Sequence, residues 1–214
     1  MNTTFFSRPR SPFRWVAFAL PVLLMAGCAE LAPQVAKAPT DVQQAARRYQ
    51  QTIELDGRLS VQYQQNGQDQ ALHGSFAWRQ TAQQTHVTLM SPLGQILAVI
   101  EVDRDHASLT QSGQPARVAD DVDQLAAQSL GWPLPVSGLR SWLQGFATNA
   151  SGKRVVAAPN DRALTTQDGW RIEYVSWDDS DPAHVHPKRI DLQRTTAQAG
   201  DVTMRIVIDK WSTP

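Results

Sequence analysis

The single cysteine of this chain, Cys28, is the residue whose chemistry the sequence positions most clearly. It ends an apolar stretch that follows three basic residues, Arg8, Arg10 and Arg14. Basic residues, then an apolar run, then small residues are the order of a secretory signal peptide. A lone cysteine in an exported protein has no partner for a disulfide bond. We therefore expect the thiol of Cys28 to be modified covalently in another way.

The residues before Cys28, with Ala26 and Gly27 nearest to it, resemble the lipobox of bacterial lipoproteins, although Met25 stands where that motif usually has leucine. The resemblance implies that Cys28 becomes the first mature residue and carries acyl chains. It divides the chain into a cleaved signal peptide (1–27), a lipidated N-terminus and tether (28–40) and one domain (41–214). Ala29, which is not aspartate, implies the outer membrane by the same resemblance.

Two alternatives remain for the N-terminal segment. One is an ordinary cleaved signal with a cysteine nearby by chance. The other is a transmembrane helix, but the apolar run over residues 15–26 is short for a membrane span.

Two other clusters contain residue types that bind metal ions, but each lacks a ligand that such a site needs. His184 and His186 could bind a metal, but a third ligand at a typical spacing is missing, so a solvated loop is the alternative. The acidic residues at 178–181 resemble a piece of a calcium loop without its downstream glutamate. The chain has no Gly-x-Ser-x-Gly elbow and no glycine-rich phosphate loop. We expect no enzyme activity, no metal and no cofactor.

The net charge of the mature domain argues against a nucleic-acid partner. Without the three arginines of the signal, 17 basic residues face 20 acidic ones, a net charge of −3, whereas phosphate binding needs concentrated Lys and Arg. The 187 mature residues suit one domain with a sizeable core. The isolated pairs Lys153–Arg154 and Lys188–Arg189 are either exposed charges at a rim or contacts for an acidic carrier or lipid headgroups.

The hydrophobic period predicts a helix, then strands, two short helices and further strands. Helical spacing predicts the first helix over residues 41–54. Alternation predicts strands from Leu59 onward, with a hairpin turn at Asn66-Gly67. Helices are expected over 120–128, ended by Gly131, and over 139–143, capped by Ser137. Eight to eleven strands with short connections indicate an antiparallel curved sheet or barrel.

Several segments, in this order, resemble the LolB family of outer-membrane lipoprotein receptors and cover essentially the whole mature chain. They are Gly57-Arg58-Leu59-Ser60-Val61, Phe76-Ala77-Trp78-Arg79-Gln80, Ser91-Pro92-Leu93-Gly94, Gly131-Trp132-Pro133-Leu134-Pro135-Val136, Gln167-Asp168-Gly169-Trp170, Pro187-Lys188-Arg189-Ile190 and Ile208-Asp209-Lys210-Trp211. The resemblance implies a mainly β fold with short helices: an unclosed antiparallel β-barrel with a hydrophobic cavity, covered by an α-helical lid.

The resemblance also implies a function. Such proteins accept lipoproteins from the periplasmic carrier LolA and insert them into the inner leaflet of the outer membrane. The partners expected are LolA, the acyl chains of client lipoproteins and the membrane, and we expect a monomer. The alternative is a lipid-anchored barrel that binds a free hydrophobic small molecule.

Apolar residues of the strands and lid are the candidates for the cavity, with ordinary core packing as the alternative for each one. The candidates are Phe76, Trp78, Leu89, Ile96, Ile100, Trp132, Leu134, Trp142, Leu143, Ile172, Tyr174 and Met204. A wider set shares the same faces: Leu59, Val61, Ala98, Leu125, Leu139, Ile190, Leu192 and Ile206.

Leu93 lies between Pro92 and Gly94, which predict a tight turn with the leucine at its tip. We expect the side chain to point outward, and the resemblance implies that it passes the client to the membrane. The alternative is a leucine folded back onto the barrel rim.

Overall fold

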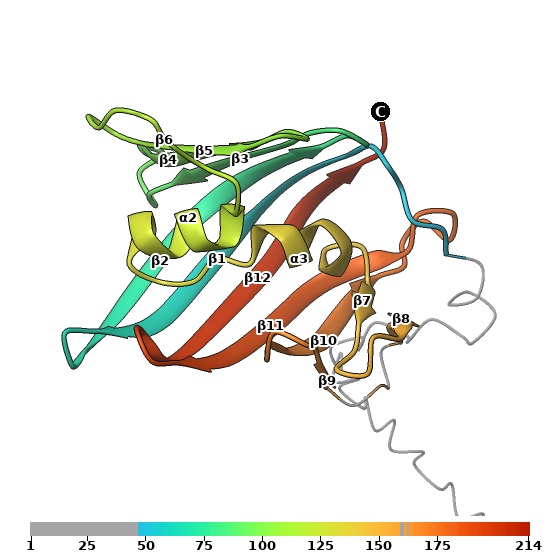
Figure 1. Ribbon diagram of the computed structural model, residues 1–214. Helices are drawn as coiled ribbons and strands as arrows, with labels where there is room; N and C mark the ends of the chain where they lie inside the picture. Colours follow the sequence, from blue (N-terminus) through green and yellow to red (C-terminus); the bar gives the residue numbers. More distant parts are fainter. Residues whose placement is uncertain (1–46, 159–160, 162) are drawn as a thin grey trace, which may run out of the picture. The chain divides into compact units, whose positions relative to one another are not determined.

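The computed structural model describes residues 47–158, 161 and 163–214 (Figure 1). The described residues all belong to one compact unit of the chain. The predicted signal peptide, Cys28 and the tether lie outside the described residues.

Twelve strands and two helices make up the described part, slightly more strands than the eight to eleven expected. They are β1 (Ile53–Gln65), β2 (Gln68–Gln80), β3 (Thr85–Met90), β4 (Ile96–Val102), β5 (Ala107–Gln111), β6 (Arg117–Ala119), α2 (Val122–Leu130), α3 (Val136–Trp142), β7 (Phe146–Thr148), β8 (Arg154–Val156), β9 (Leu164–Thr165), β10 (Arg171–Asp178), β11 (His186–Thr196) and β12 (Gly200–Ser212).

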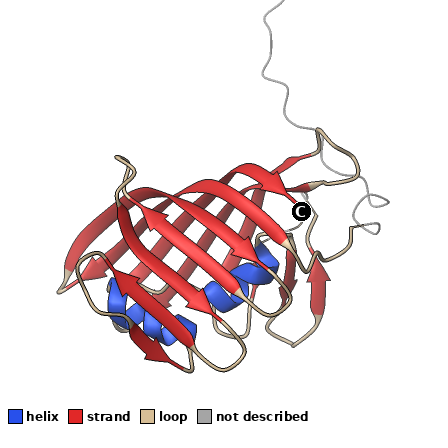
Figure 2. Ribbon diagram, turned by 90° about the horizontal axis from the view of Figure 1, so that it is seen from above, coloured by secondary structure: helices blue, strands red, loops and turns tan. Residues whose placement is uncertain are grey.

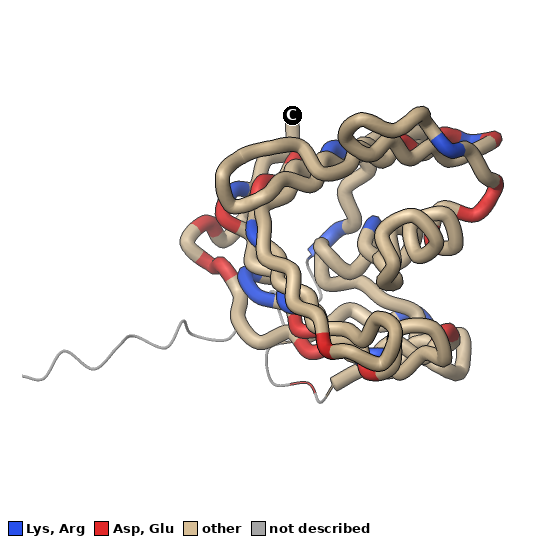
Figure 3. The backbone as a smooth tube through the Cα atoms, turned by 90° about the vertical axis from the view of Figure 1, so that its left-hand side faces the viewer, with Lys and Arg blue, Asp and Glu red and all other residues tan. Residues whose placement is uncertain are grey.

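Ten strands form one antiparallel sheet in the order β6-β5-β4-β3-β2-β1-β12-β11-β10-β9. Its two edge strands, β6 and β9, do not pair with each other, so the barrel is unclosed. The sheet bends into an open curve with both helices on its inner side (Figures 2 and 3). The expected fold, an open antiparallel barrel with a helical lid, is confirmed.

Local sequence explains why the central strands form. Inward Leu55, Leu59 and Val61 alternate with exposed residues along β1, and such alternation buries one face of a sheet. Asn66 and Gly67 have φ values of 53° and 74°, the left-handed region that a two-residue hairpin requires. The predicted hairpin between β1 and β2 is confirmed.

The first helix of the lid starts and stops as expected. The side chain of Asp121 caps α2 by accepting hydrogen bonds from the N–H groups of Asp123 and Gln124, and Gly131 ends it with φ 81°. The second lid helix, expected over 139–143, is present as α3. The expected cap is wrong, because Ser137 lies inside α3 and does not cap it. Its N–H and hydroxyl donate to the carboxylate of Asp123 instead, so a side chain of α2 takes the capping role.

The helix expected over 41–54 is wrong where it can be judged. Residues 47–52 are neither helix nor strand, and β1 begins at Ile53; the earlier part lies outside the described residues. Ile53 and Leu55 are buried as alternate residues of a strand paired with β2, and this non-local pairing prevails over the helical spacing. Neither described helix is long and apolar enough to span a membrane.

Gly57 supplies a test of the sheet packing, because it sits at the bulge where the β1–β12 register shifts. A Cβ atom there would lie 2.3 Å from the Val207 carbonyl oxygen and 2.6 Å from the Phe76 ring. Overpacking costs about 1–3 kcal/mol, so Gly57→Ala should lower the free energy of unfolding by that amount in urea titrations. Ser60→Ala, on the same strand, is the control, and equal midpoints for the two variants would contradict this packing.

Candidate functional site

An apolar cavity lies between the inner face of the sheet and the lid. It is lined by residues of β1, β2, β3 and β12 and by residues of α3 and its flanks: Leu59, Phe76, Trp78, Val87, Leu89, Leu134, Leu139, Leu143, Met204 and Ile206. Its volume is about 20 Å³, room for about one water molecule and far less than an acyl chain needs. The interior is therefore filled by its own side chains, and a larger ligand enters only if the lid moves.

Eleven of the twelve cavity candidates are buried, and six of them line this cavity: Phe76, Trp78, Leu89, Leu134, Leu143 and Met204. The other five lie elsewhere in the core: Ile100, Trp132, Trp142, Ile172 and Tyr174. Trp142, for example, meets Trp170 edge to face, with 6.4 Å between ring centroids. Val87 lines the cavity but was not among the candidates; its alternation with Leu89 on β3 was the signal that could have found it.

Ile96 does not belong to the interior, because its side chain is 52% exposed. The register between β3 and β4 shifts at Leu89/Met90, and Ile96 pairs with Met90 beyond that shift. A bulge re-aims the side chains that follow it. The expectation that Ile96 faces the cavity is therefore wrong, and the residue belongs to the surface around the neighbouring turn.

That turn, at residues 91–94, has the geometry expected. Gly94 donates a hydrogen bond to the Ser91 carbonyl oxygen (2.9 Å) and has φ 80°, so glycine is needed there. The Leu93 side chain is 89% exposed and is not folded back onto the rim. With Ile96 and Leu97, 37% exposed, it forms an exposed apolar surface that we term the apolar tip.

The two lid helices are linked to each other. Ser137 of α3 donates its N–H to Asp123 of α2 (3.0 Å), and its hydroxyl donates to the same carboxylate. Burial raises the pKa of the Asp123 carboxyl above its usual range, the Ser137 hydrogen bonds offset part of this, and Asp121 and Asp168 add to it. The link ties the start of α3 to the first turn of α2.

Glycine at position 138 allows an aromatic ring to pack against α3. A Cβ atom on Gly138 would lie 2.3–2.6 Å from the ring of Trp142, one turn further along the same helix. The Trp142 side chain therefore lies over the backbone of its own helix while it contacts the core. A larger residue at 138 would displace the indole and with it the lid packing.

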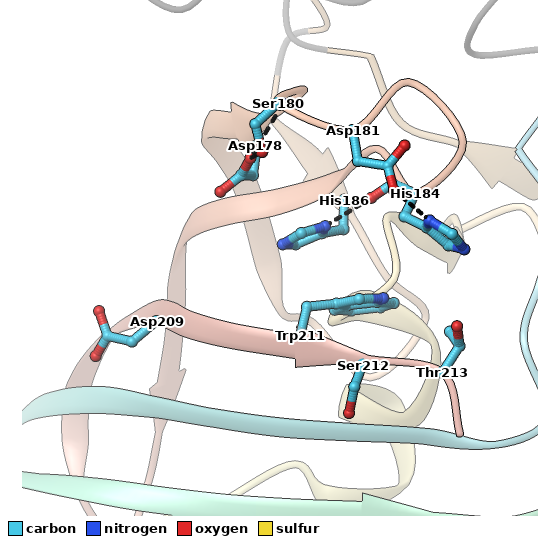
Figure 4. Close-up of a pocket in the computed structure, with 9 residues that line it drawn as sticks. All are labelled: Asp178, Ser180, Asp181, His184, His186, Asp209, Trp211, Ser212 and Thr213. Carbon is cyan, nitrogen blue, oxygen red and sulfur yellow. Dashed lines mark hydrogen bonds and ion pairs between the residues drawn. The ribbon is translucent and has the colours of Figure 1, made fainter.

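The histidines and aspartates near the chain end line a separate, open pocket of about 370 Å³ (Figure 4). His184 pairs with Asp181 (2.6 Å), and His186 contacts the His184 carbonyl oxygen and stacks on Trp211 at 4.6 Å. Within the described part of the chain, no group of three or more such side chains could hold a metal ion. These contacts account for the His and Asp residues as a structured loop.

Comparison with known proteins gives one consistent result. Residues 51–211 match the family model described as "Outer membrane lipoprotein LolB". An outer-membrane lipoprotein LolB from Cupriavidus necator is 39% identical over 188 residues, 87% of this chain and 90% of its own length. The one from Ralstonia nicotianae is 38% identical over 196 residues, 87% of this chain and 91% of its own.

Among solved structures, the chain resembles a LolA superfamily protein from Nitrosomonas europaea with a TM-score of 0.41 and 7% identity. The alignment covers 80% of this chain and 90% of that one. The similarity is too remote to bear on function.

Asp123 gives the lid a pH dependence that can be measured. Its native pKa is raised, so between the unfolded value of about 4 and the native value only the folded state keeps the proton. The contribution of Asp123 to the free energy of unfolding is therefore fully present below the unfolded pKa. It is lost as the pH rises through the native pKa. Urea midpoints from pH 4 to 7 should show this loss in the parent protein and not in Asp123→Asn. Asp120→Asn is the exposed control, and a constant difference between parent and Asp123→Asn would refute the assignment.

Proposed function

The chain belongs to the LolB family of outer-membrane lipoproteins, and from this premise we propose that it accepts lipoproteins from the carrier LolA and inserts them into the inner leaflet of the outer membrane. Membership makes the chain a lipid-anchored outer-membrane protein with a role in lipoprotein localisation, in a family of binding proteins and not of enzymes. LolA, the client lipoproteins and the membrane are the proposed partners.

The observation that carries the proposal is the wholly apolar cavity between the inner face of the sheet and the helical lid. Each buried methylene of an acyl chain contributes about 0.8 kcal/mol, so a lipoprotein with several chains needs an apolar shelter outside a membrane. The inner face of the sheet offers that surface once α3 lifts away. Leu134, Leu139 and Leu143 then leave the cavity together with the helix, which exposes the strand residues beneath.

The apolar tip supports the insertion step. Three large apolar side chains exposed around one turn are unfavourable in water and favourable in a bilayer. Pro92 also lines a groove with Arg58, His73 and Arg205. Arg58 pairs with Asp209 at 2.8 Å and Arg205 with Asp191 at 3.3 Å, so the surface beside the tip presents arginines whose charge is partly balanced.

A transfer assay tests the acceptor role. LolA loaded with a fluorescent lipoprotein is mixed with the purified protein, and the label is followed by affinity separation of the two. Movement of the label to this protein supports the proposal. A label that stays on LolA, together with a free fatty ligand that co-purifies with this protein, would support the small-molecule alternative.

Leu93→Glu tests insertion separately. A side chain this exposed contributes little to stability, so folding should be unchanged within about 0.5 kcal/mol. Loss of a buried leucine contact with the bilayer removes about 1.5–3 kcal/mol, which predicts insertion into vesicles slowed on the order of tenfold to a hundredfold. Acceptance from LolA should stay normal.

Val118→Glu is the matched control, because Val118 is also exposed (63%) but lies on β6, away from the tip. Insertion that is equally slow in both variants, or normal in Leu93→Glu, would refute the role of the tip.

A further inference from the structure

The segment that leads into β1 is bound to the lid by a partly buried two-way contact. The N–H of Gln50 donates to Gln144 Oε1 (2.8 Å), and Gln144 Nε2 donates to the Gln50 carbonyl oxygen (3.0 Å) and to that of Arg140 (3.2 Å). Gln144 lies two residues beyond the last residue of α3 and is only 4% exposed. Buried amides are costly without partners, so this pair is made or broken as a unit.

Tyr49 extends the contact to the wall of the cavity. Gln80 Nε2 donates to the Tyr49 hydroxyl (2.8 Å), and Trp78 Nε1 donates to Gln80 Oε1 (3.2 Å). The Tyr49 hydroxyl in turn lies 3.4 Å from the Arg140 carbonyl oxygen, to which it donates. Because Trp78 lines the cavity, a continuous chain of hydrogen bonds runs from the cavity wall through residue 49 to α3.

Arg47 holds the other end of the same segment. Its guanidinium lies 4.1 Å from the ring centroid of Trp177 and donates to the Ala157 carbonyl oxygen. A Cβ atom on Gly145 would come within 2.6 Å of Arg47 Nη1, and φ is 79° at this glycine. Residues 47–50 thus contact the sheet on one side and the end of the lid on the other.

We propose that residues 47–50 are a latch that holds α3 over the apolar cavity, with Gln144 as the positioning residue through which the latch acts. The proposal rests on the proposed function, in which the lid must lift for acyl chains to enter. The latch is short and its hydrogen bonds are cooperative, so moving four residues frees the end of α3.

A second attachment keeps the helix from leaving altogether. The Arg140 guanidinium donates to the carbonyl oxygens of Gln84 (3.2 Å) and Thr81 (2.8 Å) and to the Thr85 hydroxyl. These partners belong to the β2–β3 turn and the start of β3. With the latch broken, Arg140 remains as a pivot about which α3 swings.

Hydrogen exchange of the full-length protein in phospholipid nanodiscs tests the latch. Gln144→Ala removes the two bonds to Gln50, and net contributions near 1 kcal/mol each correspond to an exchange of α3 amides that is about fivefold to thirtyfold faster. Amides of β1 and β12 should exchange as before. Gln193→Ala, an exposed glutamine on β11, is the matched control and should leave α3 unchanged.

Two further variants distinguish loss of the latch from a general destabilisation of the fold. Tyr49→Phe keeps the ring against Phe146, 5.8 Å away between centroids, and removes only the hydroxyl, so it should also accelerate exchange in α3. Gln144→Glu keeps the acceptor for the Gln50 N–H and should lie between Gln144→Ala and the parent. Unchanged α3 exchange in both Gln144→Ala and Tyr49→Phe, or equal acceleration across the whole sheet, would overturn the latch.

Uptake of a fluorescent triacylated lipopeptide gives the functional readout. The latch predicts faster uptake by Gln144→Ala and Tyr49→Phe than by the parent, in the same order as their exchange rates. Faster α3 exchange with unchanged uptake would overturn the role of the latch in admitting chains. Failure of the parent to take up any lipopeptide would count against the proposed function itself, while the exchange experiment would still decide the latch.

Discussion

The structure depends on one constraint: a sheet whose inner face is apolar but whose edges never meet. A closed barrel would bury that face by itself, whereas here β6 and β9 remain apart and the two helices must cover it. Coverage by separate helices is weaker than closure by strand pairing, because only side chains and a few polar contacts hold it. The sheet is thereby held by strand pairing and the lid only by side-chain contacts, which suits the proposed role of sheltering acyl chains.

Polar side chains mark the borders of this apolar region and orient the lid. Asp123 joins α2 to α3 at one end, and Gln144 joins α3 to the segment before β1 at the other. Hydrogen bonds are directional, so they select one docking position of the helices where leucine contacts alone would allow several. The lid therefore closes in one defined arrangement.

Much of this could be predicted from the sequence because it is local. Alternation placed seven of the eight strand candidates in the core, and Asn66-Gly67, Asp121 and Gly131 acted through their own backbone geometry. The predictions that were wrong depend on contacts between residues far apart in the sequence. Tyr49 has helical spacing with its neighbours but bonds to Gln80, thirty-one positions away.

Ile96 and Ser137 failed for related reasons. Ile96 follows a register shift that depends on how β3 pairs with β4, and Ser137 lost its capping role to a carboxylate on another helix. Neither the pairing nor the neighbouring helix is visible in a local window of sequence. The cavity itself was expected from family resemblance, and its small volume depends on side-chain packing that no pattern of apolar residues reports.

The filled interior has a thermodynamic consequence for the proposed role. A client's acyl chains would not displace water from a wet pocket; they would exchange with protein side chains that already pack against one another. Only the difference between the two sets of contacts then appears as affinity, and the side chains expelled from the interior must be rehydrated or repacked. The protein's own side chains therefore compete with the acyl chains for the same apolar contacts, which lowers the affinity for the client. A binding protein of this kind would bind acyl chains less tightly than a bilayer does, so that transfer to the bilayer is favourable.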